Sequence, residues 1–360
     1  MRRSLIVLAA IAVLLPGLAL AQAQPDLGAA KSALSWIRTQ QQPDGSFPGF
    51  GPGETADAIQ AFVAYQVDPA SLAKGSVTPI AYLQAQAKSY ATSPAAAAKL
   101  TLAAVAAGAD PTTFGGLNLL ALLGAGYDPK TGQYGPDVYG HALAMLAIGS
   151  VGALPPMPAI QRLIASQLPD GGWSFDGTAD TGSDTNTTGL ALQALVGQRQ
   201  ADGARTKAIA YLQSQQNDDG GFPYSQTSQY GSDSDANSTA LAIQGLIAAG
   251  ETPTDSQWTK GGKTPLDLLI SLQNANGALR YQAAQADDNA LATYQAVPAL
   301  LQKSLPITIT PIDGAQVLVA PTATTLPATG APQVANLPSL AALLALALLV
   351  GGLALRRRAA

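Results

Sequence analysis

Apolar and polar positions along the chain form a pattern that repeats in units of two helices. Residues 208–250 hold one complete unit: a Gln-rich helix, an Asp-Gly-Gly turn followed by an aromatic residue, a loop rich in Gly, Ser and Asp, and a second, more apolar helix. Similar turn signals occur at residues 44–47, 131–134, 170–173, 219–222 and 276–279, with a degraded one at 88–91. This spacing predicts six helical hairpins between residues 24 and 303.

The two helices of each predicted hairpin differ in polarity. The second helices, expected at 55–67, 95–107, 138–148, 187–196, 238–249 and 290–301, consist mostly of small and apolar residues. A helix that is apolar on every face is buried on every face. We therefore expect an all-α fold, an α6/α6 toroid in which the second helices form an inner ring and the more polar first helices form an outer ring.

Acidic residues precede several of the expected inner helices. Asp184, Asp235 and either Asp287 or Asp288 can cap the free amide groups at these helix starts. The glycine of each Asp-Gly turn can end the preceding helix in a left-handed conformation. Because every hairpin has its turn and loop on the same side, these residues are expected to gather at one rim of the ring.

The turn motif resembles that of a known superfamily. Residues 211–222 are similar to the QW-type repeats of squalene and oxidosqualene cyclases. Those cyclases share the α6/α6 toroid with protein prenyltransferase β-subunits and cobalamin carriers. Residues 184–195 and 235–246 look most similar to cobalamin carriers of the intrinsic factor and transcobalamin type. The resemblance implies a toroid over residues 24–303.

The residues that carry chemistry in these enzymes are incomplete here. The resemblance implies a zinc site with Cys for a prenyltransferase and a reactive Cys for a complement thioester domain, but the chain contains no Cys. Class II terpene cyclases use a DxDD motif; the nearest match has Asp233 and Asp235 but ends in Ala236. The resemblance also implies that these cyclases need a second helical domain, and we expect none in this chain. We therefore expect a ring centre without their acid and metal groups, and Asp233 and Asp235 remain the candidate acids of a cyclase-like enzyme.

The expected rim is a candidate ligand-binding surface. Its aromatic residues either stack on a ligand or pack the hairpin turns, and its acids either bind Ca²⁺ or cap helices and face solvent. We favour the packing and capping roles, and expect no metal site because the acids do not have the spacing of an EF-hand loop. The candidate binding residues are Trp173, Phe175, Asp184, Phe222, Tyr224, Asp235, Tyr281 and Asp287.

The single histidine and the charge distribution narrow the choice of ligand. His141 lies on an expected inner helix, either as an axial ligand of a cobalamin or, as we favour, as a core residue bonded to a neighbouring carbonyl group. The net charge is −4, and five arginines lie in terminal segments that contain no acid, so the part between them is more acidic still. An acidic body without a basic stripe argues against a nucleic-acid partner.

Both ends of the chain carry targeting signals. Residues 1–23 have the basic start, apolar run and small-residue cleavage site of a signal peptide, although an uncleaved anchor is the alternative. Residues 304–325 are rich in Pro and Thr and are expected to form an extended stalk. Residues 326–360 resemble an LPxTG sorting signal, with a transmembrane segment expected at 338–355 and a basic tail; the motif itself is Leu326, Pro327, Ala328, Thr329 and Gly330.

The two signals predict an exported protein at the extracellular face of the cell envelope. In the LPxTG family a sortase joins the Thr to peptidoglycan; the alternative is a membrane helix that stays in place with its arginines in the cytoplasm. The expected function is a non-catalytic ligand-binding or display module. A terpene cyclase-like or lyase-like enzyme, a cobalamin-binding surface protein, and a structural wall protein with only protein partners are the alternatives.

Overall fold

The computed structural model describes residues 25–307 of the chain. The expected signal segment 1–23, most of the stalk and the sorting signal 326–360 lie outside the described residues. No helix within residues 25–307 combines the length and apolar character that a bilayer span requires.

Helices dominate the described part, with one pair of very short strands. The elements are α1 Leu27–Gln40, α2 Pro52–Ala64, η1 Pro69–Ser71, α3 Pro79–Tyr90, α4 Pro94–Ala106, α5 Leu119–Ala125, β1 Tyr127–Asp128, β2 Gln133–Tyr134, α6 Val138–Ser150, α7 Met157–Ala165, α8 Thr185–Ala194, η2 Arg199–Ala201, α9 Asp202–Gln215, α10 Ala236–Ala248, η3 Ser256–Trp258, α11 Pro265–Ser271 and α12 Ala290–Leu300.

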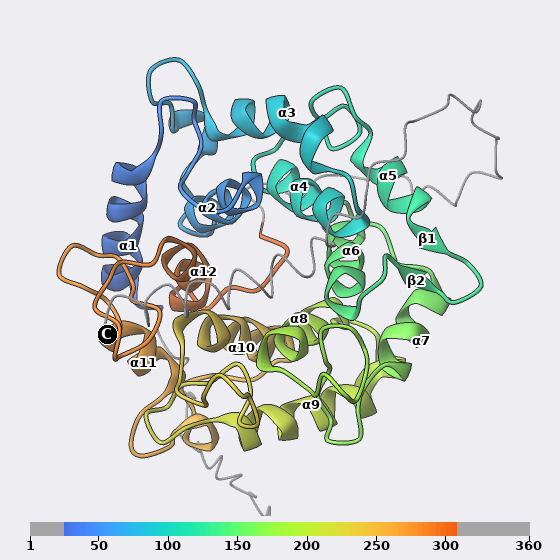
Figure 1. The fold of residues 1–360 in the computed structure, drawn as a ribbon, viewed down its shortest axis with the longest axis vertical. Coiled ribbons are helices and arrows are strands. Elements are labelled where there is room, and N and C mark those ends of the chain that lie inside the picture. Colours follow the sequence, from blue (N-terminus) through green and yellow to red (C-terminus); the bar gives the residue numbers. More distant parts are fainter. Residues whose placement is uncertain (1–24, 308–360) are drawn as a thin grey trace, which may run out of the picture.

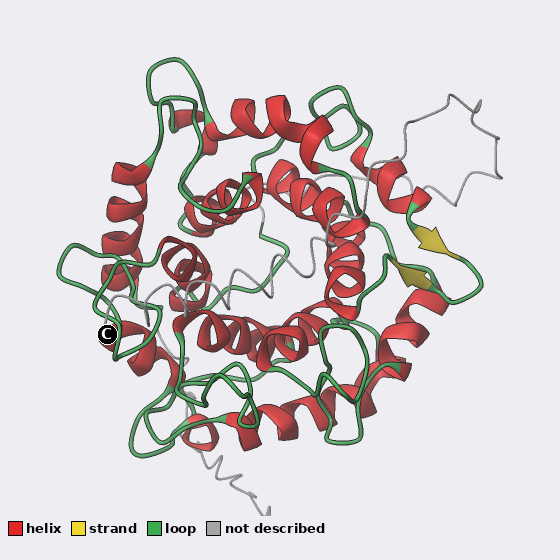
Figure 2. Cartoon of the chain, viewed as in Figure 1, coloured by secondary structure: helices red, strands yellow, loops and turns green. Residues whose placement is uncertain are grey.

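These helices form two concentric rings, which confirms the expected toroid (Figures 1 and 2). The even-numbered helices α2 to α12 form the inner ring, and the odd-numbered helices α1 to α11 surround them. Each inner helix contacts the next, and α12 contacts α2, so the ring is closed. Closure buries the end surfaces that an open stack of hairpins would leave exposed.

The Gln at the end of four outer helices links neighbouring hairpins. Gln216 donates a hydrogen bond from its side chain to the Gly220 carbonyl of its own turn and another to the Trp258 carbonyl of the next hairpin. Gln273 does the same with Gly277 and with Ala29, so the last hairpin is bonded to the first. These bonds give a physical reason for the Gln-rich turns in the sequence.

In four hairpins, a threonine near the start of the inner helix accepts a hydrogen bond from the turn that precedes it. Thr188 accepts a hydrogen bond from the Trp173 amide at 3.0 Å, and Thr239 accepts one from the Phe222 amide at the same distance. Thr55 and Thr293 do the same in the first and last hairpins. In these four hairpins the turn is thereby fixed against the inner helix that follows it.

The third hairpin departs from this plan. Its outer helix α5 is short, and the antiparallel strands β1 and β2 replace the helical turn, with Tyr127 opposite Tyr134 (Figure 2). The sequence signal at 131–134 lies in this strand pair and not at a helix end.

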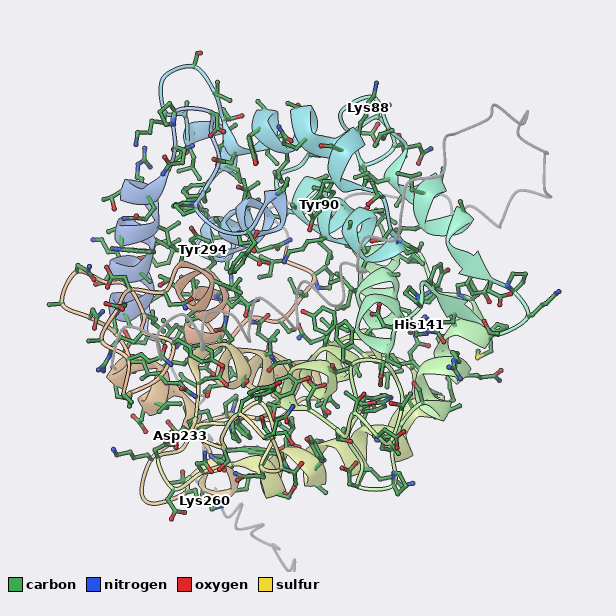
Figure 3. The ribbon with its side chains drawn as sticks, viewed as in Figure 1. Lys88, Tyr90, His141, Asp233, Lys260 and Tyr294 are labelled. Atoms are coloured by element: carbon green, nitrogen blue, oxygen red, sulfur yellow. The ribbon has the colours of Figure 1, made fainter. Side chains whose placement is uncertain are left out.

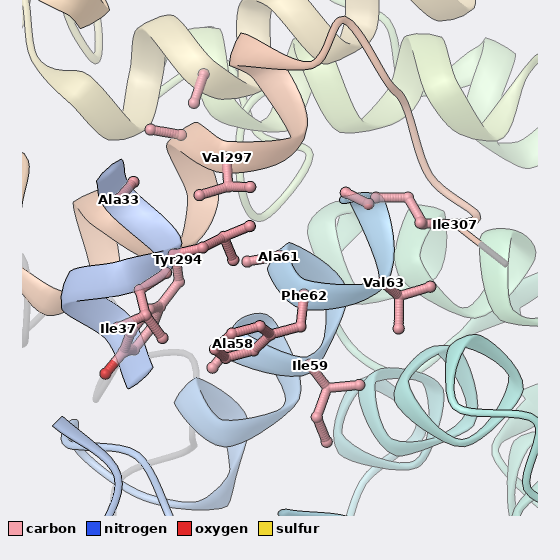
Figure 4. Close-up of a cluster of buried hydrophobic side chains, with 14 of the residues drawn as sticks. Ala33, Ile37, Ala58, Ile59, Ala61, Phe62, Val63, Tyr294, Val297 and Ile307 are labelled. Atoms are coloured by element: carbon pink, nitrogen blue, oxygen red, sulfur yellow. The ribbon is translucent and has the colours of Figure 1, made fainter. Parts of the chain in front are cut away.

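Alanine, leucine and a few aromatic side chains fill the space between the two rings. Figure 4 shows one part of this core, where Ile37 of α1, Phe62 of α2 and Tyr294 of α12 meet. The chain after α12 then crosses one end of the ring. Leu305 and Ile307, in the first part of the expected stalk, pack against the helical core.

Candidate functional site

The inner helices enclose a cavity of about 520 Å³, which we call the lumen. Every inner helix contributes to its wall, so the lumen is the centre of the ring. Its mouth lies where the inner helices begin, because Phe50, which is 76% exposed, lines the cavity just before α2. Cavities of roughly 300–1,000 Å³ are typical of small-molecule sites.

Much of the wall of the lumen is apolar. Leucine side chains from five inner helices line it, and Leu305 of the crossing segment lines it as well. The backbone amide of Leu305 donates a hydrogen bond to the side-chain oxygen of Gln193 on α8, at 2.8 Å. The crossing segment is thus fastened beneath the ring. The leucines on the inner helices are Leu102, Leu143, Leu190, Leu241 and Leu291.

A charged pair on α2 and α4 lies in the same wall as these leucines. The Lys99 Nζ atom on α4 is 2.8 Å from the Asp57 Oδ2 atom on α2, the geometry of a charge-assisted hydrogen bond. The side chains of Lys99 and Asp57 keep 26% and 18% of their surface exposed, and both line the lumen.

The surroundings of the pair shift both pKa values. Burial raises the pKa of Asp57, and the charge of Lys99 opposes this shift. Burial also disfavours the charged form of Lys99, but the negative charge of Asp57 and contributions from neighbouring groups outweigh it, so the pKa of Lys99 lies above its ordinary value. The short distance identifies the two groups as an ion pair, in which each charge compensates the other.

Two further acids line the lumen close to its mouth. Glu54 accepts a hydrogen bond from the Gly51 amide at 3.0 Å, and Asp137 accepts one from the Gly140 amide at 2.6 Å. Burial raises the pKa of Asp137. Lys99 is the basic residue of the lining, so acidic groups outnumber basic ones around the lumen.

A buried glutamine in the lumen wall lacks hydrogen-bond partners. Gln60 lies one turn beyond Asp57 on α2, is 7% exposed and lines the lumen. Neither its side-chain oxygen nor its side-chain nitrogen has a partner within the described residues. By contrast, Gln295 of the lining accepts a hydrogen bond from Asn237 at 2.8 Å. An unpaired buried amide is costly, so Gln60 calls for an explanation.

Aromatic rings also line the lumen. Tyr139 and Phe175 stack with their centroids 5.9 Å apart, and burial raises the pKa of Tyr139 to about 12. Tyr294 donates a hydrogen bond to the Pro48 carbonyl at 3.1 Å and lies where α12 adjoins α2 (Figure 3). Of the candidate binding residues, Phe175 is the one that lines the lumen.

The two candidate acids of the incomplete DxDD motif lie elsewhere. Asp233 is exposed in a loop outside the inner ring (Figure 3). Asp235 is buried at the start of α10, where it accepts hydrogen bonds from the amide and the hydroxyl group of Ser238. Burial raises the pKa of Asp235 to about 6. Neither residue lines the lumen, and the second one serves as a helix cap.

The remaining rim acids have local roles or face solvent. Asp184 caps α8 through the Thr187 amide and hydroxyl group, and burial raises its pKa to about 7. Asp287 is exposed. Within residues 25–307, no group of three or more His, Asp or Glu side chains is placed to hold a metal ion.

The other rim aromatics are part of the hairpin joints. Trp173 and Phe222 are fully buried, and the Trp173 indole donates to the Leu163 carbonyl at 2.7 Å. The carbonyl groups of Tyr224 and Tyr281 accept the amides of Thr185 and Ala236, which begin the inner helices of the preceding hairpins. These contacts are structural.

His141 faces away from the lumen, between α6 and α7 (Figure 3). Its Nδ1 atom accepts the Tyr134 amide at 3.0 Å, and its Nε2 atom bonds to the Ala159 carbonyl at 2.9 Å. Because Nδ1 accepts, the proton is on Nε2. Burial lowers the pKa of His141 to about 4. With both nitrogens engaged, His141 has none to offer to the cobalt of a cobalamin.

The lumen corrects one expectation from the sequence. We expected a ring centre without the acid groups of the related enzymes; the residues of the DxDD motif indeed lie elsewhere, but three other acids, Asp57, Glu54 and Asp137, line the centre. A usable signal was present in the sequence: Asp57 and Lys99 are the charged residues within two otherwise apolar helical segments, 55–67 and 95–107. Charges in such segments are expected to be paired and to mark a polar site.

Comparison with known proteins places the chain among toroids. The family model of the squalene-hopene cyclase C-terminal domain matches residues 122–289. No curated protein matches the sequence. The type II terpene cyclase MstE from Scytonema is a similar solved structure, with 13% identity and a TM-score of 0.55; the match covers 76% of this chain and 97% of that one.

Two other solved structures are also similar. A protein from Actinoplanes has 14% identity and a TM-score of 0.55, with 76% of this chain and 98% of that chain covered. Haptocorrin in complex with Cbi has 14% identity and a TM-score of 0.51, with 78% and 68% covered. These likenesses establish the α/α-toroid fold. Because MstE is covered almost completely, a type II terpene cyclase does not require a second helical domain, which corrects our expectation.

Proposed function

We propose that this protein is a non-catalytic, surface-anchored module that binds an elongated, largely apolar small molecule inside its ring. The observation that carries this proposal is the lumen itself. It combines about 520 Å³ of space, a largely apolar wall and a few polar groups. This is the composition of a typical ligand pocket, in which apolar surface supplies affinity and a few polar groups fix orientation.

The charge pair favours binding over catalysis. Protonation of an alkene requires a carboxylic acid that carries a proton. Asp57 instead accepts a hydrogen bond from the Lys99 ammonium group at 2.8 Å, which favours its ionised form. The pair therefore resembles a fixed dipole in the wall more than an acid catalyst.

An enzyme of the terpene cyclase type is the second candidate. Its support is the pKa of Asp57, which burial raises, within a partly aromatic lumen. One similar structure is described as MstE in complex with its substrate geranylgeranyl dihydroxybenzoate. Incubation of this protein with that compound and with geranylgeraniol, followed by mass spectrometry, distinguishes the two functions. A cyclised product that disappears in the Asp57→Asn variant would replace the binding proposal with the enzymatic one.

The location of the module is part of the proposal. Residues 1–23 support export, and the motif Leu326 to Gly330 with the apolar run and Arg356 to Arg358 supports attachment at the outer face of the envelope. Sortase and peptidoglycan are the proposed partners. Mass spectrometry of the native protein tests this, since sortase action leaves Thr329 as the last residue, linked to a peptidoglycan fragment. An intact C-terminus would favour a membrane helix.

Blocking the lumen tests the binding proposal. In the purified full-length chain, Leu241→Trp on α10 places a large ring in the lumen, whereas Leu154→Trp changes an exposed leucine and serves as the control. We expect geranylgeraniol to raise the melting temperature of the wild type and of the control, but not that of Leu241→Trp. Equal responses in all three proteins would place binding outside the lumen and reject the proposal.

A further inference from the structure

From the polar groups of the lumen we infer that the ligand carries an uncharged hydroxyl group at its polar end, and not a phosphate, a carboxylate or an amine. This inference rests on the proposed function, because it describes the molecule that the lumen would hold. It specifies the chemistry of the ligand's polar end, which the fold alone does not determine. The groups that carry it are Gln60, the Asp57–Lys99 pair and the acids Glu54 and Asp137.

The charges of the lining argue against an anionic ligand. Lys99 is the one basic side chain in the lining, and its ammonium group is already bonded to Asp57 at 2.8 Å. Glu54 and Asp137 line the mouth, and neither forms an ion pair with a basic side chain of residues 25–307. An anion that entered would therefore approach two unpaired acids and compete with Asp57 for its only counter-charge, in a site of low dielectric constant where such repulsion is strong.

Gln60 argues for a group that both donates and accepts. Its side-chain oxygen needs a donor and its side-chain nitrogen needs an acceptor, and neither is provided by the described residues. A hydroxyl group can donate one hydrogen bond and accept another, whereas an ammonium group only donates and a phosphate dianion only accepts. A single hydroxyl group thus matches the two unmet needs of this buried amide.

The position of Gln60 fits an orientation of the ligand. Gln60 lies three positions after Asp57 on α2, so the two side chains share one face of that helix. Leu241 of α10 and Leu305 of the crossing segment line the same cavity. A hydroxyl group at Gln60 and an apolar body against the leucines would satisfy both parts of the wall at once.

A set of ligands with one common body tests this inference. Farnesol, farnesyl phosphate, farnesylamine and the hydrocarbon farnesene differ only at the polar end, and their affinities for the full-length protein can be measured by isothermal titration calorimetry. We expect farnesol to bind about tenfold more tightly than farnesene and still more tightly than farnesyl phosphate. This comparison needs only the wild-type protein.

A variant then assigns the preference to Gln60. Gln60→Leu removes the amide, so the tenfold advantage of farnesol over farnesene should disappear while farnesene binds at least as well as before. Gln84→Leu on the outer helix α3 changes an exposed glutamine and should leave the ratio unchanged. If farnesol kept its advantage in Gln60→Leu, the assignment to Gln60 would be wrong.

The possible outcomes separate this inference from the proposed function. Tightest binding of farnesyl phosphate or of farnesylamine would overturn the hydroxyl preference but would support a lumen that binds apolar molecules. Equal affinity for all four compounds would show that the polar end is not recognised. It would likewise overturn the hydroxyl preference and support a lumen that binds apolar molecules. No binding of any member would count against the proposed function itself, and this inference would fall with it.

Discussion

The Asp57 carboxylate and the Lys99 ammonium group meet at 2.8 Å across the contact between α2 and α4. The two residues lie on neighbouring inner helices, and both line the lumen. The pair therefore does two things: it joins adjacent hairpins, and it places a fixed dipole in a largely apolar wall.

Removing one member of this pair should destabilise the protein more than removing both. Asp57→Leu leaves the Lys99 charge without a partner in a largely enclosed site, and we expect a loss of about 2–4 kcal/mol in unfolding free energy. The double variant Asp57→Leu/Lys99→Met should recover most of that loss, because no charge is then left unpaired. Urea unfolding of the wild type and of the single and double variants measures the coupling. Additive losses would mean that the pair contributes no such coupling.

His141 should make stability decrease in mildly acidic solution. Its pKa is about 4 in the folded protein, below the ordinary value near 6.5, because burial disfavours the charged ring. The folded state therefore binds the proton less readily than the unfolded state. The stability is complete above a pH of about 6.5, falls as the pH decreases towards about 4, and loses about 3 kcal/mol in this window.

Replacing His141 with Thr isolates the contribution of His141 to the pH dependence of stability. Other hairpins use Thr188 or Thr239 where the third uses His141, so His141→Thr should keep the bond to the Tyr134 amide. Subtracting the unfolding free energy of this variant from that of the wild type removes the contributions of other titrating groups, including Asp184 and Asp235. This difference in unfolding free energy should fall as the pH is lowered from 7.5 to 4. A difference that does not change with pH would contradict a His141 pKa of about 4.

Two glycines allow the inner helices α8 and α10 to pack closely. A Cβ atom added to Gly189 would lie 2.4 Å from the Leu241 carbonyl oxygen, and one on Gly245 would meet Gly189 itself. We expect Gly189→Ala to destabilise the protein by about 2–3 kcal/mol because these backbones cannot separate without opening the ring. The matched control is Gly149→Ala on α6, where nothing lies within 4 Å of the added atom. It should gain about 0.5–1 kcal/mol from improved helix propensity. Thermal unfolding of both variants is the measurement, and a stable Gly189→Ala would argue against the close packing.

The segment beneath the lumen should loosen when its hydrogen bond is removed. Gln193→Leu leaves the Leu305 amide without its 2.8 Å partner. We expect faster hydrogen exchange at Leu305 and a stability loss of about 1 kcal/mol. Hydrogen exchange followed by mass spectrometry of the peptide that contains Leu305 checks this, with Gln84→Leu as the control. Unchanged protection would show that packing of Leu305 alone holds the segment.

Much of the architecture could be predicted from the sequence, because it depends on local patterns. Turn glycines, capping residues such as Asp184 and Asp235, and the contrast between polar and apolar helices are properties of short segments. They were enough to predict six hairpins and the assignment of helices to an inner and an outer ring. The third hairpin, where β1 and β2 replace a helical turn, was missed because its turn signal resembles the others.

The candidate site could not be predicted in this way. The inner helices are apolar on nearly every face, so their sequences do not indicate which face points to the ring centre. The rim residues Trp173, Phe222 and Asp235 attracted attention because they repeat with the hairpins, and they repeat because they build the joints. Asp57 and Lys99 do not belong to that repeat, so the repeat pattern did not single them out. Gln60 does repeat, as Gln193 and Gln244 in the helices α8 and α10, but the pattern does not show that its amide lacks partners.

The sequence by itself thus determined the helices, their order and their division into two rings, since short-range hydrogen bonding and polarity decide these features. Only the tertiary structure decided that the ring is hollow and that an ion pair and an unpaired glutamine line it. These features depend on the rotation of each helix about its own axis and on side chains that are distant in the chain, and closure of the ring sets both.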